Sequence, residues 1–213
     1  MKCKRTNLVS TFKHAMEIAS VLVVVSMLMV FSGCGATDDG PPVVTPQYFG
    51  MTGKTVAVMV SADPETLLYP NAPFQVSTAV SRRMKIDVTG VKTVDPKQII
   101  EFQKKNPTWI AFTPRELLAE LKVDRLVIID LQQYTTHERG NRHVWKGTIA
   151  ARATVYEKED ANRPAYSTEV TALYPSNTSI GVLDSDDLSI QVGMLNQFAT
   201  SVSGRFRVHE KDE

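Results

Sequence analysis

The chain has 213 residues, of which 43% are hydrophobic and 22% are charged, and its formal net charge is +1. These values are typical of a globular protein and exclude a disordered chain. Without residues 1–33, twenty basic and twenty-two acidic residues remain, which is a net charge of −2. A nearly neutral remainder without a basic block gives no electrostatic basis for nucleic acid binding.

Residues 1–33 have the organisation of a secretory signal peptide. A basic stretch is followed by a continuous apolar run of 14 residues, from Ile18 to Phe31, and then by the small residues Ser32 and Gly33. A membrane-spanning helix needs about 20 apolar residues, so the run is short for a span. We therefore expect export and removal of residues 1–33.

The stretch FSGC at residues 31–34 resembles the lipobox of bacterial lipoproteins, where Leu is commoner than Phe31 at the first position. The resemblance implies that Cys34 becomes the first mature residue and carries three acyl chains, palmitate among them. Three chains make attachment effectively permanent, because each buried CH₂ contributes about 0.8 kcal/mol. An uncleaved anchor and a plain secretory signal with a chance cysteine are the alternatives. Gly35, where inner-membrane lipoproteins often have Asp, implies the outer membrane, facing the periplasm.

Three further segments follow the signal. Residues 34–53 are rich in Gly, Pro and Asp and show no helical or strand period, which predicts a flexible tether after Cys34. Residues 54–208 hold the regular patterns of one α/β domain, and residues 209–213 form a charged tail. Cys3 lies in the signal, so Cys34 is the only cysteine that the mature chain would keep.

The domain begins with alternating strand and helix patterns. A strand is predicted at 55–61 and a helix after the candidate N-cap Asn71, followed by a second short strand at 91–94. The next helix opens with Asp95 and Pro96 and stops before Pro107, and Thr113 with Glu116 has the spacing of a capping box. An almost continuously apolar strand is predicted at 125–135.

Two alternating strands, 144–156 and 165–174, follow and are expected to pair antiparallel. The register that matches their faces sets Ala151 opposite Val170 and Arg152 opposite Glu169. One pairing of strand 125–135 with 144–156 would place Asp130 diagonal to Arg152. The expected result is a cross-strand ion pair rather than a pair of catalytic carboxylates, because the arginine keeps both carboxyl groups ionised.

The last predicted element is a helix capped by Ser185 and ending near Gly204. Its apolar stripe is interpreted as core rather than as a membrane or partner face. The stripe consists of Leu188, Val192, Leu195, Ala199, Val202 and Phe206.

The element order β-α-β-α-α-β-β-β-α predicts a two-layer α/β sandwich. It consists of a mixed sheet of about five strands with helices mainly on one face. The run LLAELKVDRLVIIDLQQY at 117–134, with the later Gly147, resembles a small α/β domain found in three groups of envelope proteins. These are the curli-secretion-channel type of lipoprotein, the lipoprotein activators of peptidoglycan synthases, and the Tol-system β-propeller protein, which has the domain at its N-terminus. The resemblance implies assembly and protein contacts and supplies no catalytic residue.

The sequence contains no recognised catalytic, metal or cofactor constellation. His137, Glu138 and His143 could meet at a hairpin tip, but their spacing matches no established zinc motif, so a solvated loop is expected. Trp109 lies in an irregular segment and is interpreted as packed under the sheet, with a contact to a partner as the alternative.

These observations favour a membrane-anchored periplasmic lipoprotein that acts as a binding or adaptor module in envelope assembly or transport, without enzymatic activity or cofactor. Its expected partners are the membrane, through the lipid on Cys34, and a protein of the envelope. An envelope hydrolase of unknown substrate and a structural subunit of a secretion or transport complex, including a homo-oligomer, are the alternatives.

Overall fold

The computed structural model describes residues 43–63, 69–138, 140–176, 180–207 and 209–210. Within them the order of the main elements is the predicted one. The strands of the large sheet are β2 (Thr55–Ala62), β3 (Lys92–Thr93), β4 (Arg125–His137), β5 (Trp145–Glu157) and β6 (Tyr166–Tyr174). The helices are α2 (Ala72–Asp87), α3 (Pro96–Lys105), the 3-10 turn η3 (Trp109–Ala111), α4 (Pro114–Glu120) and α5 (Asp187–Gly204).

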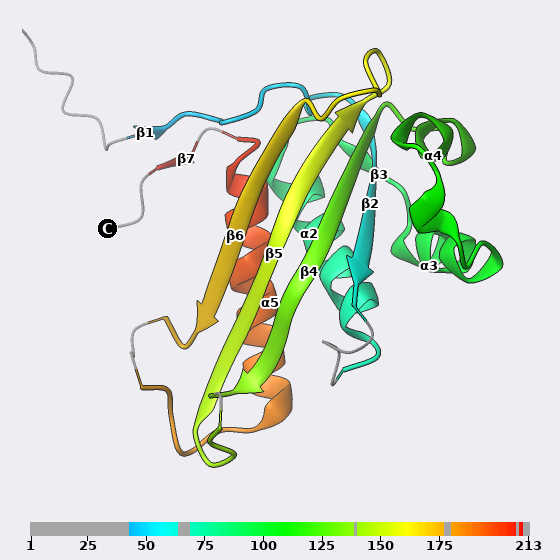
Figure 1. The fold of residues 1–213 in the computed structure, drawn as a ribbon. Coiled ribbons are helices and arrows are strands. Elements are labelled where there is room, and N and C mark those ends of the chain that lie inside the picture. Colours follow the sequence, from blue (N-terminus) through cyan, green and yellow to red (C-terminus); the bar gives the residue numbers. More distant parts are fainter. Residues whose placement is uncertain (1–42, 64–68, 139, 177–179, 208, 211–213) are drawn as a thin grey trace, which may run out of the picture. The chain divides into compact units, whose positions relative to one another are not determined.

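The five strands form one mixed sheet in the order β3-β2-β4-β5-β6, as Figure 1 shows. β2 runs parallel to β3 and β4, while β5 runs antiparallel to both of its neighbours, β4 and β6. The predicted register of the last two strands is confirmed, since Ala151 pairs with Val170 and Arg152 with Glu169. The predicted α/β sandwich is confirmed with it.

The pairing considered for β4 and β5 is wrong by two positions. Asp130 lies directly opposite Arg152 instead of diagonal to it. Further along, the register shifts between Leu131 and Gln133, where β4 carries a bulge. The bulge leaves both Gln132 and Gln133 exposed and returns Tyr134 to the buried face, because it adds one residue to the alternation.

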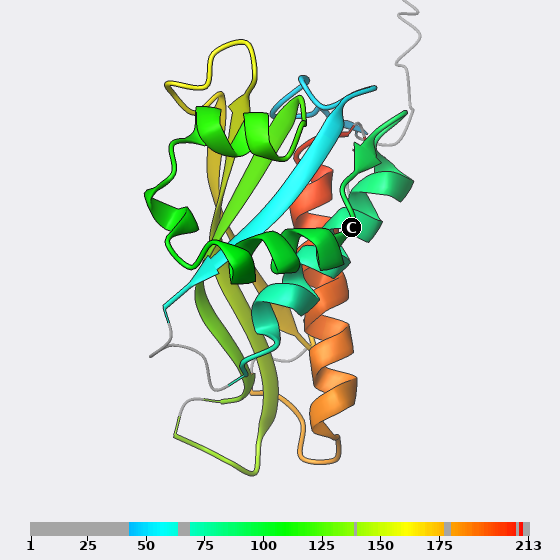
Figure 2. The same ribbon diagram turned by 90° about the vertical axis from the view of Figure 1, so that its right-hand side faces the viewer.

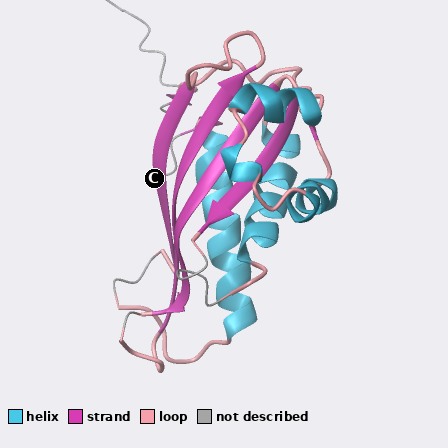
Figure 3. Cartoon of the chain, turned by 45° about the vertical axis from the view of Figure 1, so that its right-hand side comes forward, coloured by secondary structure: helices cyan, strands magenta, loops and turns pink. Residues whose placement is uncertain are grey.

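The long helices α2 and α5 lie side by side on one face of the sheet (Figures 2 and 3). The main core fills the space between them and the sheet and includes Val58, Val80, Ile149 and Phe198. Gly147 permits the close approach of α5 to β5, because a Cβ there would lie 2.9 Å from both Ile190 Cγ2 and Met194 Sδ.

A smaller core lies on the opposite face of the sheet, over β2 and the start of β4. It contains Ile99 from α3, Leu117 from α4 and Trp109 from η3. Trp109 is only 8% exposed, so the structure gives it the packing role and not that of a surface anchor. The two cores make β2 apolar on both faces, which explains why its sequence does not alternate.

Most helix starts follow the predicted chemistry. Thr113 and Glu116 form the full capping box of α4, and Asp95 accepts a hydrogen bond from the Lys97 amide. Asn71 stands at the N-cap of α2 but makes no capping bond with its side chain. The cap predicted at Ser185 is wrong, because Asp186 accepts from the Ser189 amide at 3.0 Å.

The predicted core stripe of α5 is wrong in its first half. Leu188 is 69% exposed and Val192 is 50% exposed. The buried positions there are Ile190, Met194 and Phe198. The prediction failed because α5 carries apolar residues on more than one face, and periodicity alone does not say which face meets the sheet.

Part of the predicted tether lies against the domain. Met51 is fully buried, and the ring of Tyr48 stacks on Tyr166 with 6.0 Å between centroids. The short strand β1 (Val43–Val44) pairs antiparallel with β7 (His209–Glu210), which falls in the predicted charged tail. The packed region therefore begins before residue 54, where the sequence placed its boundary.

The signal segment and Cys34 lie outside the described residues. Among those that are described, no helix combines the length and the hydropathy that a bilayer crossing requires.

Candidate functional site

The predicted ion pair lies on the open face of the sheet. The Arg152 guanidinium donates to Glu169 Oε1 at 2.7 Å, and both side chains are more than half exposed. Asp130 accepts a hydrogen bond from Ser61 Oγ at 3.2 Å. The three residues lie close together, but exposed groups of this kind contribute little to stability and form no enclosed site for a reaction.

The histidine loop does not assemble a metal site. His137 stacks on Trp145 with ring centroids 4.0 Å apart, and Glu138 forms an ion pair with Lys146 at 3.6 Å. His143 is exposed. Within the described part of the chain, no group of three metal-binding side chains comes together.

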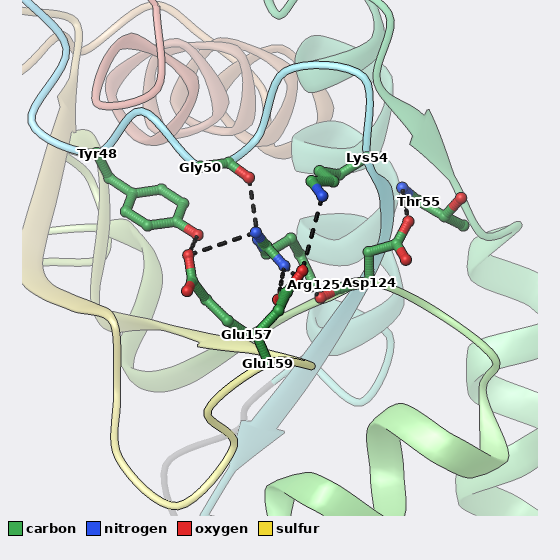
Figure 4. A network of polar contacts seen from close by, with 8 residues as sticks. All are labelled: Tyr48, Gly50, Lys54, Thr55, Asp124, Arg125, Glu157 and Glu159. Carbon is green, nitrogen blue, oxygen red and sulfur yellow. Dashed lines mark hydrogen bonds and ion pairs between the residues drawn. The ribbon is translucent and has the colours of Figure 1, made fainter.

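A buried arginine that sequence reasoning missed ties the segment before β2 to the sheet (Figure 4). Arg125 is 5% exposed and donates through Nε to the carbonyl of Gly50 at 2.9 Å. Its other nitrogens form ion pairs with Glu157 and Glu159, and Glu157 also accepts from the Tyr48 hydroxyl. The network therefore holds Tyr48 and Gly50 against the ends of β4 and β5.

The electrostatics of this network are structural rather than catalytic. Burial alone would lower the pKa of Arg125, but the neighbouring Tyr48, Glu159 and Glu157 raise it above its ordinary value. Burial, followed by the bond to Glu157, raises the pKa of Tyr48 well above its ordinary range. At neutral pH the arginine stays charged and the phenol stays protonated, so neither can act as a general base.

A second polar network joins three elements at the other end of the sheet. Asp187 at the start of α5 accepts from Thr136 Oγ1 of β4 at 2.6 Å and from the Tyr69 hydroxyl at 2.9 Å. Partial burial alone would raise the pKa of Asp187, but the bonds from Thr136, Tyr69 and Gln191 lower it. The carboxylate thus fixes the start of α5 to the sheet.

The most distinctive surface is the outer line of α5. Leu188, Val192 and Asn196 follow one another at intervals of four residues and are exposed. We call these three residues the α5 ridge. Exposed apolar residues scattered singly need no explanation, but two that stand one turn apart beside open grooves make this the candidate contact surface.

Each side of the ridge carries an open groove. The α2–α5 groove has a volume of about 510 Å³, and Phe74 and Ile86 of α2 contribute to its lining. The α5–β6 groove has a volume of about 800 Å³ and is bounded by Tyr174 at the end of β6. Val192 and Asn196 line both grooves and so separate them, whereas Leu188 lines the α5–β6 groove alone.

The sequence contained a signal for this surface. The predicted core stripe includes Leu188 and Val192, and Ile190 and Met194, two positions further on in each case, supply a second apolar line. A helix with apolar residues on several faces has more apolar surface than one sheet can cover. The excess of apolar residues indicates that the helix exposes one apolar line. It does not indicate which of the two lines is exposed.

No protein-family model matches the chain, and no curated protein matches it. Among solved structures, the PelC dodecamer from Paraburkholderia phytofirmans is similar, with a TM-score of 0.50 and 8% identity over 79% of this chain and 97% of that one. Lipoprotein GNA1162 from Neisseria meningitidis gives a TM-score of 0.44 and 14% identity over 65% of this chain and 90% of that one. The hypothetical protein CT253 from Chlamydia trachomatis gives a TM-score of 0.44 and 16% identity over 72% of this chain and 97% of that one. At these identities the likeness to PelC is one of fold, and the family of this chain is not established by it.

Proposed function

We propose that this protein is a lipid-anchored binding module of the bacterial cell envelope, without catalytic activity, that docks a protein partner on the outer side of α5. The observation that carries the proposal is the exposure of Leu188 and Val192 along open grooves, of which Val192 lines both and Leu188 lines the α5–β6 groove. Aromatic and aliphatic side chains of a partner gain most where such grooves exclude water around them.

The anchor is the other half of the proposal. The lipobox-like FSGC supports acylation at Cys34, in the outer membrane and facing the periplasm. Residues 1–33 would then be absent from the mature protein. Mass spectrometry of the protein from a bacterial host is expected to find a chain that starts at Cys34 with three acyl chains, and a Cys34→Ala variant is expected to lack them. A chain that starts at Met1, or a cleaved chain without acyl mass, would contradict the anchor.

The chemistry of the domain supports binding over hydrolysis. The Arg152–Glu169 pair is exposed, and the buried Arg125 is fully engaged in holding the segment before β2. An envelope hydrolase would need a general base or nucleophile aimed into a pocket. The lining of the two grooves beside α5 includes no histidine, cysteine or carboxylate.

A second candidate function is that of a subunit in a homo-oligomer. The similar PelC structure is a dodecamer, and this chain covers 97% of its subunit. Light scattering of the lipidated protein in detergent separates the two candidates. A stable oligomer of defined size favours the subunit, and a monomer favours the adaptor.

Photo-crosslinking tests the docking surface. A photo-reactive phenylalanine derivative placed at position 192 in intact envelopes is expected to capture one discrete protein. The same derivative at position 120, which is exposed at the end of α4, serves as the control and is expected to capture none. Absence of a product at position 192, or the same product at both positions, would overturn the docking surface.

A further inference from the structure

The two edges of the large sheet differ in how well they are protected. The β3 edge is only two residues long and carries Lys92, two features that discourage pairing with another strand. The β6 edge is nine residues long and contains neither proline nor lysine. No strand in the described part of the chain pairs with its outer side. β6 is therefore the edge on which a further strand can form (Figure 1).

We infer that the β6 edge receives an extended segment of the protein partner, which pairs with β6 as an additional strand and packs its apolar side chains against α5. This inference rests on the proposed docking function and names its mode. Main-chain hydrogen bonds provide affinity in such β-strand addition, and the side chains on alternate positions provide specificity.

The available edge runs from residue 167 to residue 174. Its first residue, Tyr166, is engaged by the Tyr48 ring and by Gln47, which accepts from the Tyr166 hydroxyl. The remaining length offers about 25 Å of backbone at about 3.3 Å a residue. α5 has 18 residues and therefore a length of about 27 Å, which is comparable with the length of the edge. The helix packs against β6, so it lies alongside this edge.

The α5–β6 groove lies where the side chains of an added strand would point. Such a strand would lie about 4.8 Å beyond β6, beside Tyr174, with one face toward α5. Gly193 lets the Tyr174 ring approach the helix, since a Cβ there would lie 2.3 Å from the ring. The groove continues along the helix past Leu188 and Val192, which offer apolar contact to the incoming residues.

The other face of the added strand would meet mainly polar residues. On the open side of the sheet β6 exposes Ser167, Glu169 and Thr171, followed by the apolar Leu173 near its end. Just before α5, Asp184 and Asp186 are exposed and lie in the chain between the exposed Leu183 and Leu188. The segment that fits alternates apolar with polar residues and carries basic ones, because cross-strand pairs of opposite charge are favourable.

The charge of β6 favours a basic partner over a second copy of this chain. A second copy of β6 would bring another Glu169 and no lysine or arginine, so the two edges would offer each other no cross-strand pair of opposite charge. A basic strand from another protein supplies the positive charges that β6 itself lacks. The exposed carboxylates of Glu169, Asp184 and Asp186 likewise disfavour the anionic surface of a membrane as the occupant.

Hydrogen exchange on the full-length lipidated protein in detergent tests the inference. The probe is the blocked nonapeptide Lys-Val-Thr-Val-Lys-Val-Thr-Val-Lys, and the control peptide has every second amide N-methylated. The probe is expected to slow exchange at alternate amides between 167 and 173 by at least tenfold while leaving Lys92 and Thr93 unchanged. The methylated peptide is expected to have no effect. Unchanged exchange in β6 at a saturating concentration of the probe would overturn the inference.

Variants on α5 give a second measurement that does not depend on altering the strand. Val192→Arg is expected to weaken probe binding at least tenfold, because it replaces an apolar side chain of the groove with a charged one opposite the valines of the peptide. Glu120→Arg, on the exposed end of α4, is expected to leave binding within twofold. Equal affinity for both variants would remove the groove from the binding site and overturn the inference.

Photo-crosslinking at positions 171 and 192 separates this inference from the proposed function. Capture of the same partner at both positions, with exchange slowed in β6, supports both. Capture at 192 without capture at 171 overturns strand addition and leaves the docking function standing. Capture of a second copy of this chain at 171 overturns the assignment of a separate partner. No capture at either position overturns the docking function itself.

Discussion

Leu188 and Ile190 lie two positions apart on α5 and face opposite environments. Leu188 is 69% exposed, whereas Ile190 is 1% exposed and packs close to Gly147 of β5. One side of α5 therefore covers the main core, and another side presents the apolar residues that the proposed partner would contact.

Truncation of these two residues should give opposite results for stability. Ile190→Ala is expected to reduce the free energy of unfolding by about 2–4 kcal/mol, because it removes a buried aliphatic side chain and leaves a cavity. Leu188→Ala is expected to change it by less than about 0.5 kcal/mol, as surface substitutions usually do. Urea denaturation measures both. Similar losses in the two variants would mean that Leu188 is packed and that the α5 ridge is not a free surface.

The sequence predicts the order of the elements because each carries a local signal. The Thr113–Glu116 capping box, the alternation of β5 and β6 and the apolar run of β4 depend only on neighbouring residues, and all appear in the structure. The register of β5 and β6 was also predictable, because a shift by one residue would have turned every side chain to the wrong face.

The remaining features depend on contacts between distant segments. The bulge after Leu131 changes the face of every later β4 residue, and no local signal marks it. Arg125 lies among apolar residues at the start of β4, where its burial depends on Gly50, Glu157 and Glu159. The face of α5 that meets the sheet is likewise decided by Gly147, which lies in another strand.

The buried and the exposed arginine provide a matched pair for a second prediction. Arg125→Ala is expected to reduce the free energy of unfolding by about 3 kcal/mol, because it leaves Glu157 and the Gly50 carbonyl without their buried partner. Arg152→Ala removes an exposed ion pair and is expected to reduce it by less than about 1 kcal/mol. Thermal and urea unfolding test the difference, and equal losses would contradict the assigned role of Arg125.

Acidification should weaken the attachment of α5 to the sheet through Asp187. Its pKa is lowered in the folded protein, so its contribution is fully present above the ordinary Asp value of about 3.9 and is lost as pH falls through the lowered value. Asp187→Asn is expected to reduce the free energy of unfolding at pH 7 by about 1 kcal/mol and to flatten its decline below pH 4. The control Asp130→Asn alters an exposed carboxylate on the open face. An unchanged acid profile in Asp187→Asn would contradict this role.

Gly147 connects the packing of α5 with the proposed strand site. A Cβ at this position would lie 2.9 Å from Ile190 and Met194, so Gly147→Ala must push α5 away from β5 or force the two side chains to move. Overpacking of this kind is expected to reduce the free energy of unfolding by about 1–3 kcal/mol. The neighbouring Ala150→Val change, on the open face of β5, is expected to alter it by less than about 0.5 kcal/mol. Because a displaced α5 also alters the α5–β6 groove, Gly147→Ala should weaken binding of the nonapeptide at temperatures where the variant remains folded. Destabilisation without weaker binding would show that the groove does not take part in strand addition.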